Sequence, residues 1–359
     1  SCSPPCRSRK LLPNAQGCEG AWLADPMLDA IIGGAPIPFA KVDLPVMDEG
    51  PAGWKERAQY LALRGLVGGW GFLPAGLSRG FSRGLAKLLP GIDPRHALVA
   101  ADFIGTAFPA YSETEVRQLV QQAYGHLVDV SLRADHLRRK MIGHPVGDFF
   151  DLEFCDEARE LFEARGHGKG VIGLSAHLGW WEITAHVLNP LGLGPACAIM
   201  KPPKNAFLTR YIVRSRAQMG GGLCLPRHGA MSALPTLLRA GATLQLLVDQ
   251  RAHRRFVEAP FFGRMASCDR TLGVLARRVP KPILVYACLG TEDPERFRFV
   301  APKVIDPEEL SGLSALEITT RVNLEIESLI RMAPEQYLWL HDRFRDRPAS
   351  APTPQSALS

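Results

Sequence analysis

The sequence predicts an α/β fold in which helices flank a mostly parallel central sheet. From residue 171 onward, short apolar runs alternate with segments whose apolar residues recur at helical spacing. Such alternation is typical of strand–helix–strand units, whose strands lie parallel. Hydrophobic residues make up 46% of the 359 positions. The chain is therefore long and apolar enough to bury a large core around such a sheet.

Four segments are expected along the chain. Residues 1–50 are rich in Pro, Gly and Ala and lack periodicity, so we expect a disordered or loosely packed extension. A helical region over 51–165 follows, because apolar residues recur at helical spacing between Glu113 and Leu132. The α/β domain is expected over 166–348, and a flexible tail of mostly Pro, Ser and Ala over 349–359.

All but one of the expected strands are short apolar runs, the exception being 296–300, and the helices at 181–188 and 205–219 end at residues that stop helices. The helix at 181–188 ends at Asn189-Pro190, and the helix at 205–219 ends at three glycines. The expected strands cover residues 171–175, 196–200, 223–225, 244–248, 283–288 and 296–300. The remaining expected helices cover residues 54–89, 156–165, 230–239, 270–278 and 318–332.

The charge balance argues against a nucleic-acid partner. The net charge is +6, but no lysine-rich arm and no interleaved aromatic and basic residues are present. A mildly basic chain suits an anionic lipid surface or an acidic protein partner. Five of the eight cysteines are scattered, and Cys2, Cys6 and Cys18 have no paired partners, so we expect no metal site. Scattered thiols favour a reducing compartment.

One apolar segment near the N-terminus suggests contact with a membrane surface. No window reaches the roughly 18 uncharged apolar residues that a spanning helix needs. The segment Gly65–Ser78 is bounded by arginines and contains Trp70, Phe72, Leu73 and Leu77. Two interpretations remain open for residues 60–89. The segment lies in a membrane interface, with arginines toward the headgroups, or it is a buried helical hairpin.

The strand at 171–175 ends in a small-residue turn that carries His177, and Glu182 follows with four residues between them. The two would lie about 140° apart on a regular helix, so they meet only if the chain bends around Gly179. Together they would form a general base and the carboxylate that orients it. The alternative is a surface histidine beside a helix that opens with glutamate.

A second polar group follows the strand at 244–248. Asp249 and Gln250 come directly after it, then a basic loop over 251–255, then Phe261-Phe262. The carboxyl ends of parallel strands gather the chemistry of such sheets, and His177 and Asp249 both lie at such ends. Charged groups beside an apolar wall suit a substrate with a charged head and an apolar chain. The alternative is that Asp249 caps a turn and that the two phenylalanines belong to the core.

These residues carry a resemblance to a known family. His177-Leu-Gly-Trp-Trp-Glu182 resembles the HX4(D/E) motif of the bacterial lipid A biosynthesis acyltransferases and, more widely, of lysophospholipid and glycerolipid acyltransferases. The likeness covers about residues 55–348. Further blocks resemble the same family in the same order: Lys201–Asn205, Arg216–Gly220, Pro226–Gly229, Asp249-Gln250, Ala259–Gly263 and Glu335–His341, followed by Arg343-Phe-Arg345 and Arg347-Pro348.

The chain also departs from the family pattern at four places, one of which is an apolar N-terminal segment weaker than the family's usual membrane anchor. Trp180 stands where the family motif usually has asparagine, and Val248 where it usually has proline. The loop after Gln250 is more basic than the family's and lacks its glycines. The departure at Trp180 predicts a changed acceptor pocket. These differences leave the chemistry intact and leave the identity of the substrate open.

The resemblance implies a glycerolipid-acyltransferase-like layered fold and transfer of a fatty acyl chain from an acyl thioester to a lipid hydroxyl. The donor would be acyl carrier protein or coenzyme A, and the acceptor a lipid A precursor or related glycolipid. No cofactor, metal or Ser or Cys nucleophile would be needed. The expected site is the cytoplasmic face of the bacterial inner membrane, with the membrane surface as a partner.

The resemblance also assigns residue roles. His177 would be the general base and Glu182 its orienting carboxylate. Backbone amides near Gly179 or in the turn Arg227–Gly229 would stabilise the oxyanion. Arg216 and Arg227 would contact phosphate groups, and Asp249 and Gln250 would help to bind substrate. Phe261 and Phe262 would line an acyl channel, whereas Trp339 and His341 would pack the last segment.

Three alternatives remain open. The first keeps the reaction and changes the acceptor to a phosphatidylinositol mannoside, an ornithine lipid or a lysophospholipid. The second is a catalytically silent, membrane-associated lipid-binding protein of the same fold. The third is a thioesterase-like hydrolase that uses water as the acceptor.

Overall fold

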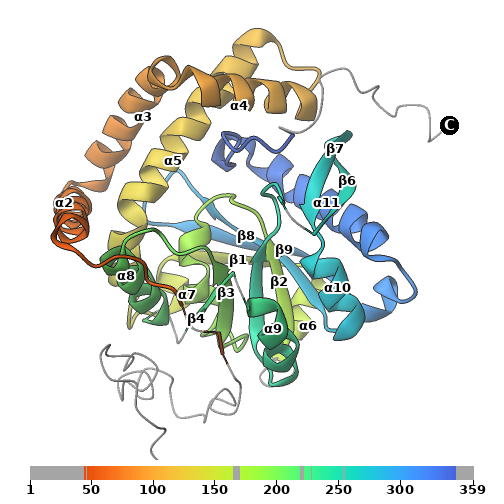
Figure 1. Cartoon of the computed structure of the whole chain (residues 1–359). Coiled ribbons are helices and arrows are strands. Elements are labelled where there is room, and N and C mark those ends of the chain that lie inside the picture. Colours follow the sequence, from red (N-terminus) through yellow and green to blue (C-terminus); the bar gives the residue numbers. More distant parts are fainter. Residues whose placement is uncertain are drawn as a thin grey trace, which may run out of the picture.

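A seven-stranded sheet forms the centre of the molecule (Figure 1). The structure is a computed structural model that describes residues 44–45, 47–164, 170–218, 222–227, 229–253 and 255–344. The strand order is β1-β9-β8-β2-β5-β3-β4, and every neighbouring pair is parallel except β8 and β9. The predicted mixed α/β fold with a mostly parallel central sheet is therefore confirmed.

The strands agree closely with the expected ranges. The sheet consists of β1 (Phe150–Phe154), β2 (Val171–Ser175), β3 (Ala196–Met200), β4 (Leu223–Pro226), β5 (Thr243–Leu247), β8 (Ile283–Gly290) and β9 (Phe297–Ile305). A separate antiparallel hairpin consists of β6 (Phe256–Phe261) and β7 (Arg264–Asp269). The sequence analysis did not predict β1 or the hairpin. In β1 the charged Asp151 and Glu153 interrupt the apolar run, and in β6 Pro260 argues against a strand.

Helices cover both faces of the sheet. They are α2 (Trp54–Trp70), α3 (Ala75–Ile92), α4 (Pro94–Ala107), α5 (Glu113–Met141), α6 (Asp156–Glu163), α7 (Ala185–Leu188), α8 (Ala206–Ala217), α9 (Ala230–Arg239), α10 (Thr271–Arg278) and α11 (Ala315–Met332). The single helix expected over 54–89 is two helices, because Gly71 and Pro74 interrupt it. The helix expected over 181–188 is a 3₁₀ turn, Trp181–Ile183, followed by the short α7.

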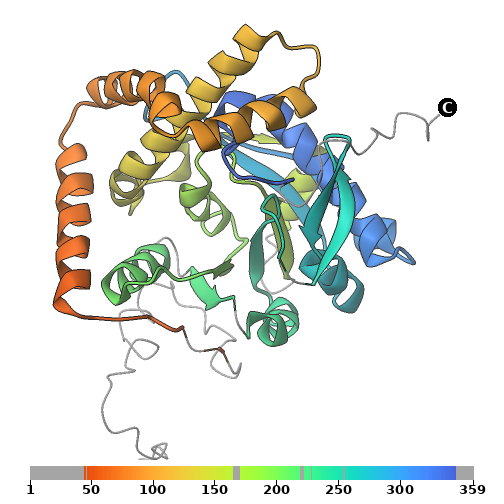
Figure 2. The same ribbon diagram turned by 45° about the horizontal axis from the view of Figure 1, so that its top comes forward.

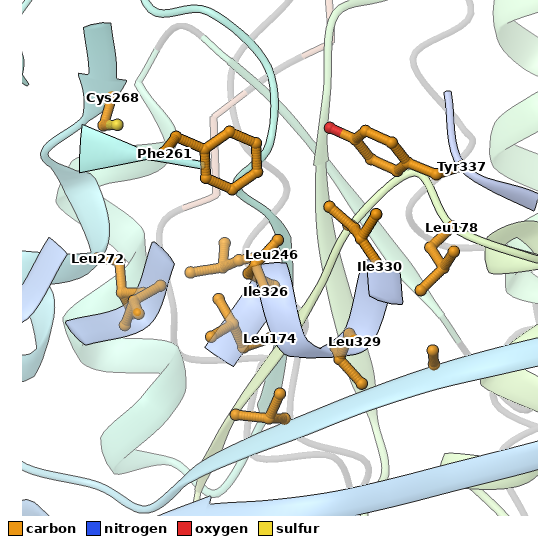
Figure 3. Packing of buried hydrophobic residues seen from close by; sticks show 14 of the residues in the cluster. Leu174, Leu178, Leu246, Phe261, Cys268, Leu272, Ile326, Leu329, Ile330 and Tyr337 are labelled. Atoms are coloured by element: carbon orange, nitrogen blue, oxygen red, sulfur yellow. The ribbon is translucent and has the colours of Figure 1, made fainter. Parts of the chain in front are cut away.

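Alternating side chains of the strands build two cores, one on each face of the sheet. Ile172 and Leu174 of β2 point into one, which includes the hairpin and α9 to α11. Figure 3 shows Leu174 and Leu246 from the sheet beside Ile326 and Ile330 of α11. Val171 of β2 points into the other, which includes α5 to α7. Every residue of β2 is buried, as expected for a central parallel strand.

The N-terminal helices form a layer beside this domain (Figure 2). The long α5 begins with a capping box of Ser112 and Glu115 and packs against α2, α3 and α4. No helix in the described ranges is both long and apolar enough to cross a membrane. Residues 60–89 do not form a hairpin that is buried as a whole, because α2 buries none of its residues and Phe72 is 90% exposed, although Ser78, Ser82 and Ala86 of α3 are buried.

The first placed residues lie against the domain. Leu44 packs against the core, Glu49 forms an ion pair with Arg210 at 2.7 Å, and the carbonyl of Pro51 accepts a hydrogen bond from Ala206. The expectations for residues 1–43 and for the tail over 349–359 lie outside the described residues. The proposed division into domains stays a prediction, and β1, from the expected helical region, pairs with β9 in the sheet.

Candidate active site

A sharp turn at the end of β2 carries His177, and contacts from three other parts of the chain fix it. Gly179 has a φ of +59°, and a Cβ there would overlap the carbonyl oxygen of Cys288, so only glycine fits. The Gly179 amide donates to the carbonyl of Gln336 at 2.9 Å, and the Gly179 carbonyl lies 2.9 Å from the His126 ring. The Gly179 amide itself is thus already paired, and an oxyanion role for other backbone amides near Gly179 stays a prediction.

Asp249 lies beside His177 because β5 and β2 are parallel neighbours. The His177 Nδ1 atom lies 2.9 Å from Asp249 Oδ1, and the His177 backbone amide donates to Oδ2 at 3.1 Å. One buried carboxylate therefore holds both the ring and the backbone of His177. Held in this way, Nδ1 carries the ring proton and Nε2 has a free lone pair. The Gln250 side-chain amide lies 3.3 Å from Nε2 and can donate to it.

The electrostatics of the pair favour an ionised Asp249. Burial raises the pKa of Asp249, but the charge and hydrogen bonds of His177 and the charge of Arg343 outweigh it, so its pKa is lowered. Burial lowers the pKa of His177, but the charge and hydrogen bond of Asp249, with a further contribution from Glu182, raise it above its ordinary value. The imidazolium is thus stabilised in place, as a general base requires once it has accepted a proton.

Glu182 does not orient His177, contrary to the sequence prediction. Its carboxylate accepts two hydrogen bonds from Arg216 Nη2, at 2.8 and 3.0 Å. The reason is the direction of the 3₁₀ turn after Gly179, which carries Glu182 toward α8. The paired carboxylate raises the pKa of Arg216, although burial lowers it. Glu182 acts on His177 through its charge and not through a hydrogen bond.

A cavity of about 1490 Å³ opens beside these groups. The predicted site residues that line it are His177, Glu182, Arg216, Arg227, Gly229 and Gln250. Its wall also carries further basic residues, namely Lys201, Arg251, His253 and Arg255. Small or apolar residues from the sheet and α7 line it elsewhere, namely Ala185, Ala196, Ala198 and Leu247. The cavity thus offers an apolar surface and cationic groups next to a candidate base.

Three predicted pocket residues lie in the core instead. Phe261 and Phe262 do not line the cavity. They pack in the aromatic cluster around Phe103, and Figure 3 places Phe261 among the buried side chains. The hairpin that carries them packs against α11, where Asn323 donates to the Pro260 carbonyl at 2.7 Å. Trp180, expected to change the acceptor pocket, is buried against Phe297.

The basic turn is only partly available as an oxyanion site. The Arg227 amide donates to the carbonyl of Met200 at 3.1 Å. Gly229, with a φ of +82°, precedes α9 and lines the cavity together with the first residues of that helix. The arginine side chain is exposed at the cavity wall.

Residues that the sequence analysis missed or left without a catalytic role surround the pair. The Trp181 ring stands edge-on to His177, with centroids 5.4 Å apart. Tyr337 and Arg343 approach Asp249 from the last segment, whose family resemblance was the available signal. His341 accepts a hydrogen bond from the Arg251 amide at 2.9 Å, and Trp339 is fully buried, so both pack as expected. The described ranges contain no cluster of His, Cys, Asp and Glu arranged for a metal ion.

Comparison of the sequence with known proteins finds several relatives of this chain. The family model described as bacterial lipid A biosynthesis acyltransferase matches residues 57–346. The lipid A biosynthesis palmitoleoyltransferase of Escherichia coli K12 is 25% identical over 260 residues, which cover 71% of this chain and 80% of the relative. The lipid A biosynthesis lauroyltransferase of the same strain is 21% identical over 272 residues, 75% of this chain and 86% of the relative. A lipid A biosynthesis acyltransferase of Haemophilus influenzae is 23% identical over 247 residues, 67% of this chain and 73% of the relative.

Proposed function

The chain belongs to the bacterial lipid A biosynthesis acyltransferase family, and on this premise we propose that it moves a fatty acyl chain from a thioester to a hydroxyl group of a lipid A precursor or related glycolipid. The thioester is carried by acyl carrier protein or coenzyme A. The observation that carries the proposal is the buried contact of Asp249 with His177 Nδ1, which leaves Nε2 beside a large cavity. No metal or organic cofactor takes part in the proposed reaction.

The reaction is a direct attack of the acceptor on the donor. His177 Nε2 takes the proton of the acceptor hydroxyl while its oxygen bonds to the thioester carbon. The carbon–sulfur bond then breaks, and the imidazolium returns the proton to the leaving thiolate. Asp249 holds the ring in the required tautomer and stabilises the imidazolium. A general base of this kind contributes about 10²–10⁴-fold in rate.

The cations of the cavity support a role in binding anionic groups. Arg227 is exposed at the wall, and Lys201 and Arg255 line the same cavity. Arginine forks match phosphate geometry, so these side chains suit a phosphate on the acceptor or on the phosphopantetheine arm of the donor. Arg216 is bound to Glu182, and in this proposal the pair shapes the wall and supplies a local charge.

The N-terminal helices support binding to the cytoplasmic face of the inner membrane. Large apolar side chains of α3 and the turn before it are exposed, including Phe72 at 90%, Leu77 at 64% and Phe81 at 55%. Arg83 and Lys87 follow on the same helix. Apolar side chains flanked by cations are typical of a segment that lies in an anionic lipid interface.

The test is acyl transfer from a labelled acyl-carrier-protein thioester, and separately from acyl coenzyme A, into a bacterial lipid extract. The wild type is expected to give a labelled lipid whose mass identifies the acceptor, and His177→Ala to lose the activity. Thioester loss without labelled lipid would instead indicate a hydrolase. No turnover with either donor would indicate a catalytically silent, lipid-binding protein of the same fold. Turnover that does not depend on His177 would refute the role of His177 as general base.

A further inference from the structure

The segment that follows α11, residues 334–344, contacts both turns that carry the candidate catalytic pair. Beside β2, the Leu338 amide donates to the His177 carbonyl at 3.1 Å, and the Gln336 carbonyl accepts from Gly179. An antiparallel bridge joins Leu178 to Tyr337 between these two bonds. The segment therefore pairs with the backbone of the His177 turn like a short extra strand.

The same segment contacts the Asp249 turn through Arg343, whose side chain is almost fully buried. Its guanidinium donates to the carbonyls of Val248 and Gln250, the residues on either side of Asp249. It also donates to the carbonyl of Ser267 in the hairpin at 3.2 Å. A planar, permanently charged fork suits this task, because it can donate to several carbonyls at once.

Tyr337 completes the contact with Asp249. Its side chain is buried, and its phenol is near enough to the Asp249 carboxylate to feel its negative charge. Burial, and then the negative charge of Asp249, raise the pKa of Tyr337 well above its ordinary value, so the phenol stays protonated and can donate. Asp249 thus accepts hydrogen bonds from His177 and lies near the Tyr337 phenol, while Arg343 fixes the backbone that carries it.

We propose that Arg343 and Tyr337 are positioning residues of the acyl transfer, which place the Asp249 carboxylate against His177 Nδ1 and set the strength of that contact. The inference rests on the proposed function and adds a role for two residues that do not line the substrate cavity. Asp249 follows a strand end and lies in a turn, so its direction depends on what holds that turn. Residues 334–344 supply this support through Arg343.

The charges around the pair predict the direction in which the pKa of His177 changes when Arg343 is replaced. The titratable and charged groups near His177 include Asp249, Glu182, Arg216 and His341, and those near Asp249 include His177, Arg343, Tyr337 and His341. Without the Arg343 cation, Asp249 attracts the His177 proton more strongly. The imidazolium then persists to higher pH, and the acid limb of kcat/KM, which requires neutral His177, moves upward by roughly one unit.

The experiment compares Arg343→Met, Arg343→Lys and Tyr337→Phe with the wild type. For each, the pH profile of kcat/KM, the kcat and the thermal midpoint are measured. His177 is also titrated by NMR, assigned with His177→Ala. The matched control is Arg331→Met. The Arg331 guanidinium also lies over a core aromatic ring, 4.8 Å from the centroid of Phe262, but it donates to the carbonyl of Ala107, which is far from Asp249 in the sequence.

Arg343→Met is expected to lower kcat about 10- to 100-fold and to raise the pKa of His177. Arg343→Lys is expected to restore the pKa and only part of kcat, because lysine keeps the charge and loses the fork. Arg331→Met is expected to keep the wild-type profile. A wild-type profile and His177 titration in folded Arg343→Met would overturn the inference.

If Arg343→Met does not fold, Tyr337→Phe decides, since it removes only a hydroxyl. Loss of that hydroxyl is also expected to raise the pKa of His177 and to lower kcat. Wild-type kcat and titration in Tyr337→Phe would overturn the inference. The His177 titration needs no substrate, so failure of the inference is distinguishable from failure of the proposed function, which would appear as absence of transfer in the wild type.

Discussion

Replacing Asp249 by asparagine separates the observed His177–Asp249 pair from the His177–Glu182 pair that the sequence suggested. Asp249 accepts two hydrogen bonds from His177, one from Nδ1 at 2.9 Å and one from the backbone amide at 3.1 Å. The asparagine side chain has one acceptor oxygen and one donor nitrogen. If the oxygen keeps the backbone amide, the nitrogen faces Nδ1.

In that arrangement Nδ1 must accept a hydrogen bond, so the ring proton moves to Nε2 and the base is lost. The comparable change in a Ser-His-Asp triad, which lowers kcat about 10⁴-fold, sets the scale, and we expect a loss of about 10³–10⁴-fold in kcat for Asp249→Asn. The pKa of His177 is expected to fall, because Asp249 supplies the largest contributions that raise it. The assay is single-turnover transfer of a labelled acyl chain, with His177 titrated by NMR.

The matched control is Glu182→Gln, the same carboxylate-to-amide change five residues after His177. It weakens the two hydrogen bonds with Arg216 and leaves Nδ1 in contact with Asp249. We expect a loss of about tenfold or less, because only a charge near His177 is removed. Near wild-type turnover in Asp249→Asn together with collapse in Glu182→Gln would refute the reasoning and restore the sequence-based pair.

The remaining predictions concern the fold and the exposed N-terminal segment. Gly179→Ala is expected to destabilise the protein by about 1–3 kcal/mol and to abolish acyl transfer, because φ at this residue is positive and the new methyl group would overlap the Cys288 carbonyl. Thermal unfolding measures the stability and the transfer assay measures the activity. An unchanged thermal midpoint would contradict this prediction. Asp135 accepts hydrogen bonds from three arginines and Tyr211, and these lower its pKa against the effect of burial. Asp135→Asn is therefore expected to lower the free energy of unfolding by about 1–3 kcal/mol at any pH above the ordinary pKa of aspartate, where Asp135 is ionised. The loss is expected to shrink as the pH falls toward the lowered pKa of Asp135 in the folded protein, which chemical unfolding at several pH values would detect. A difference that does not depend on pH would count against an ionised Asp135. Phe72→Ser is expected to weaken binding to anionic vesicles without changing the thermal midpoint, whereas Leu316→Ser, which changes an exposed leucine on α11, is expected to leave binding unchanged; equal effects would argue against a membrane-facing role for Phe72.

The sequence located the sheet well and the pairing of its site residues poorly. Short apolar runs gave six of the strands, and the rule that polar residues gather at carboxyl ends put His177 and Asp249 at the same edge. The rule does not give the strand order. In the observed order β8-β2-β5-β3, β5 is the neighbour of β2, and this brings Asp249 to the His177 Nδ1 atom.

Local sequence features misled the analysis at other positions. Glu182 was expected to contact His177 because it is close in sequence and completes a known motif. The path of the turn instead brings its carboxylate to Arg216, which donates a hydrogen bond to it. Phe261 and Phe262 fit a channel and a core equally well as sequence, and the hairpin that carries them was not predicted. Arg343 contacts the carbonyls around Asp249 across 93 and 95 residues of chain, which no spacing rule would reveal.

The most direct test of the central claim is acceptor-dependent acyl transfer from an isotopically labelled acyl-carrier-protein thioester to a purified lipid A precursor, followed by mass spectrometry. The account predicts a labelled ester on the acceptor with the wild type, and loss of that product with His177→Ala while the variant keeps its thermal midpoint. A labelled ester formed equally well by folded His177→Ala would contradict the claim that His177 is the general base.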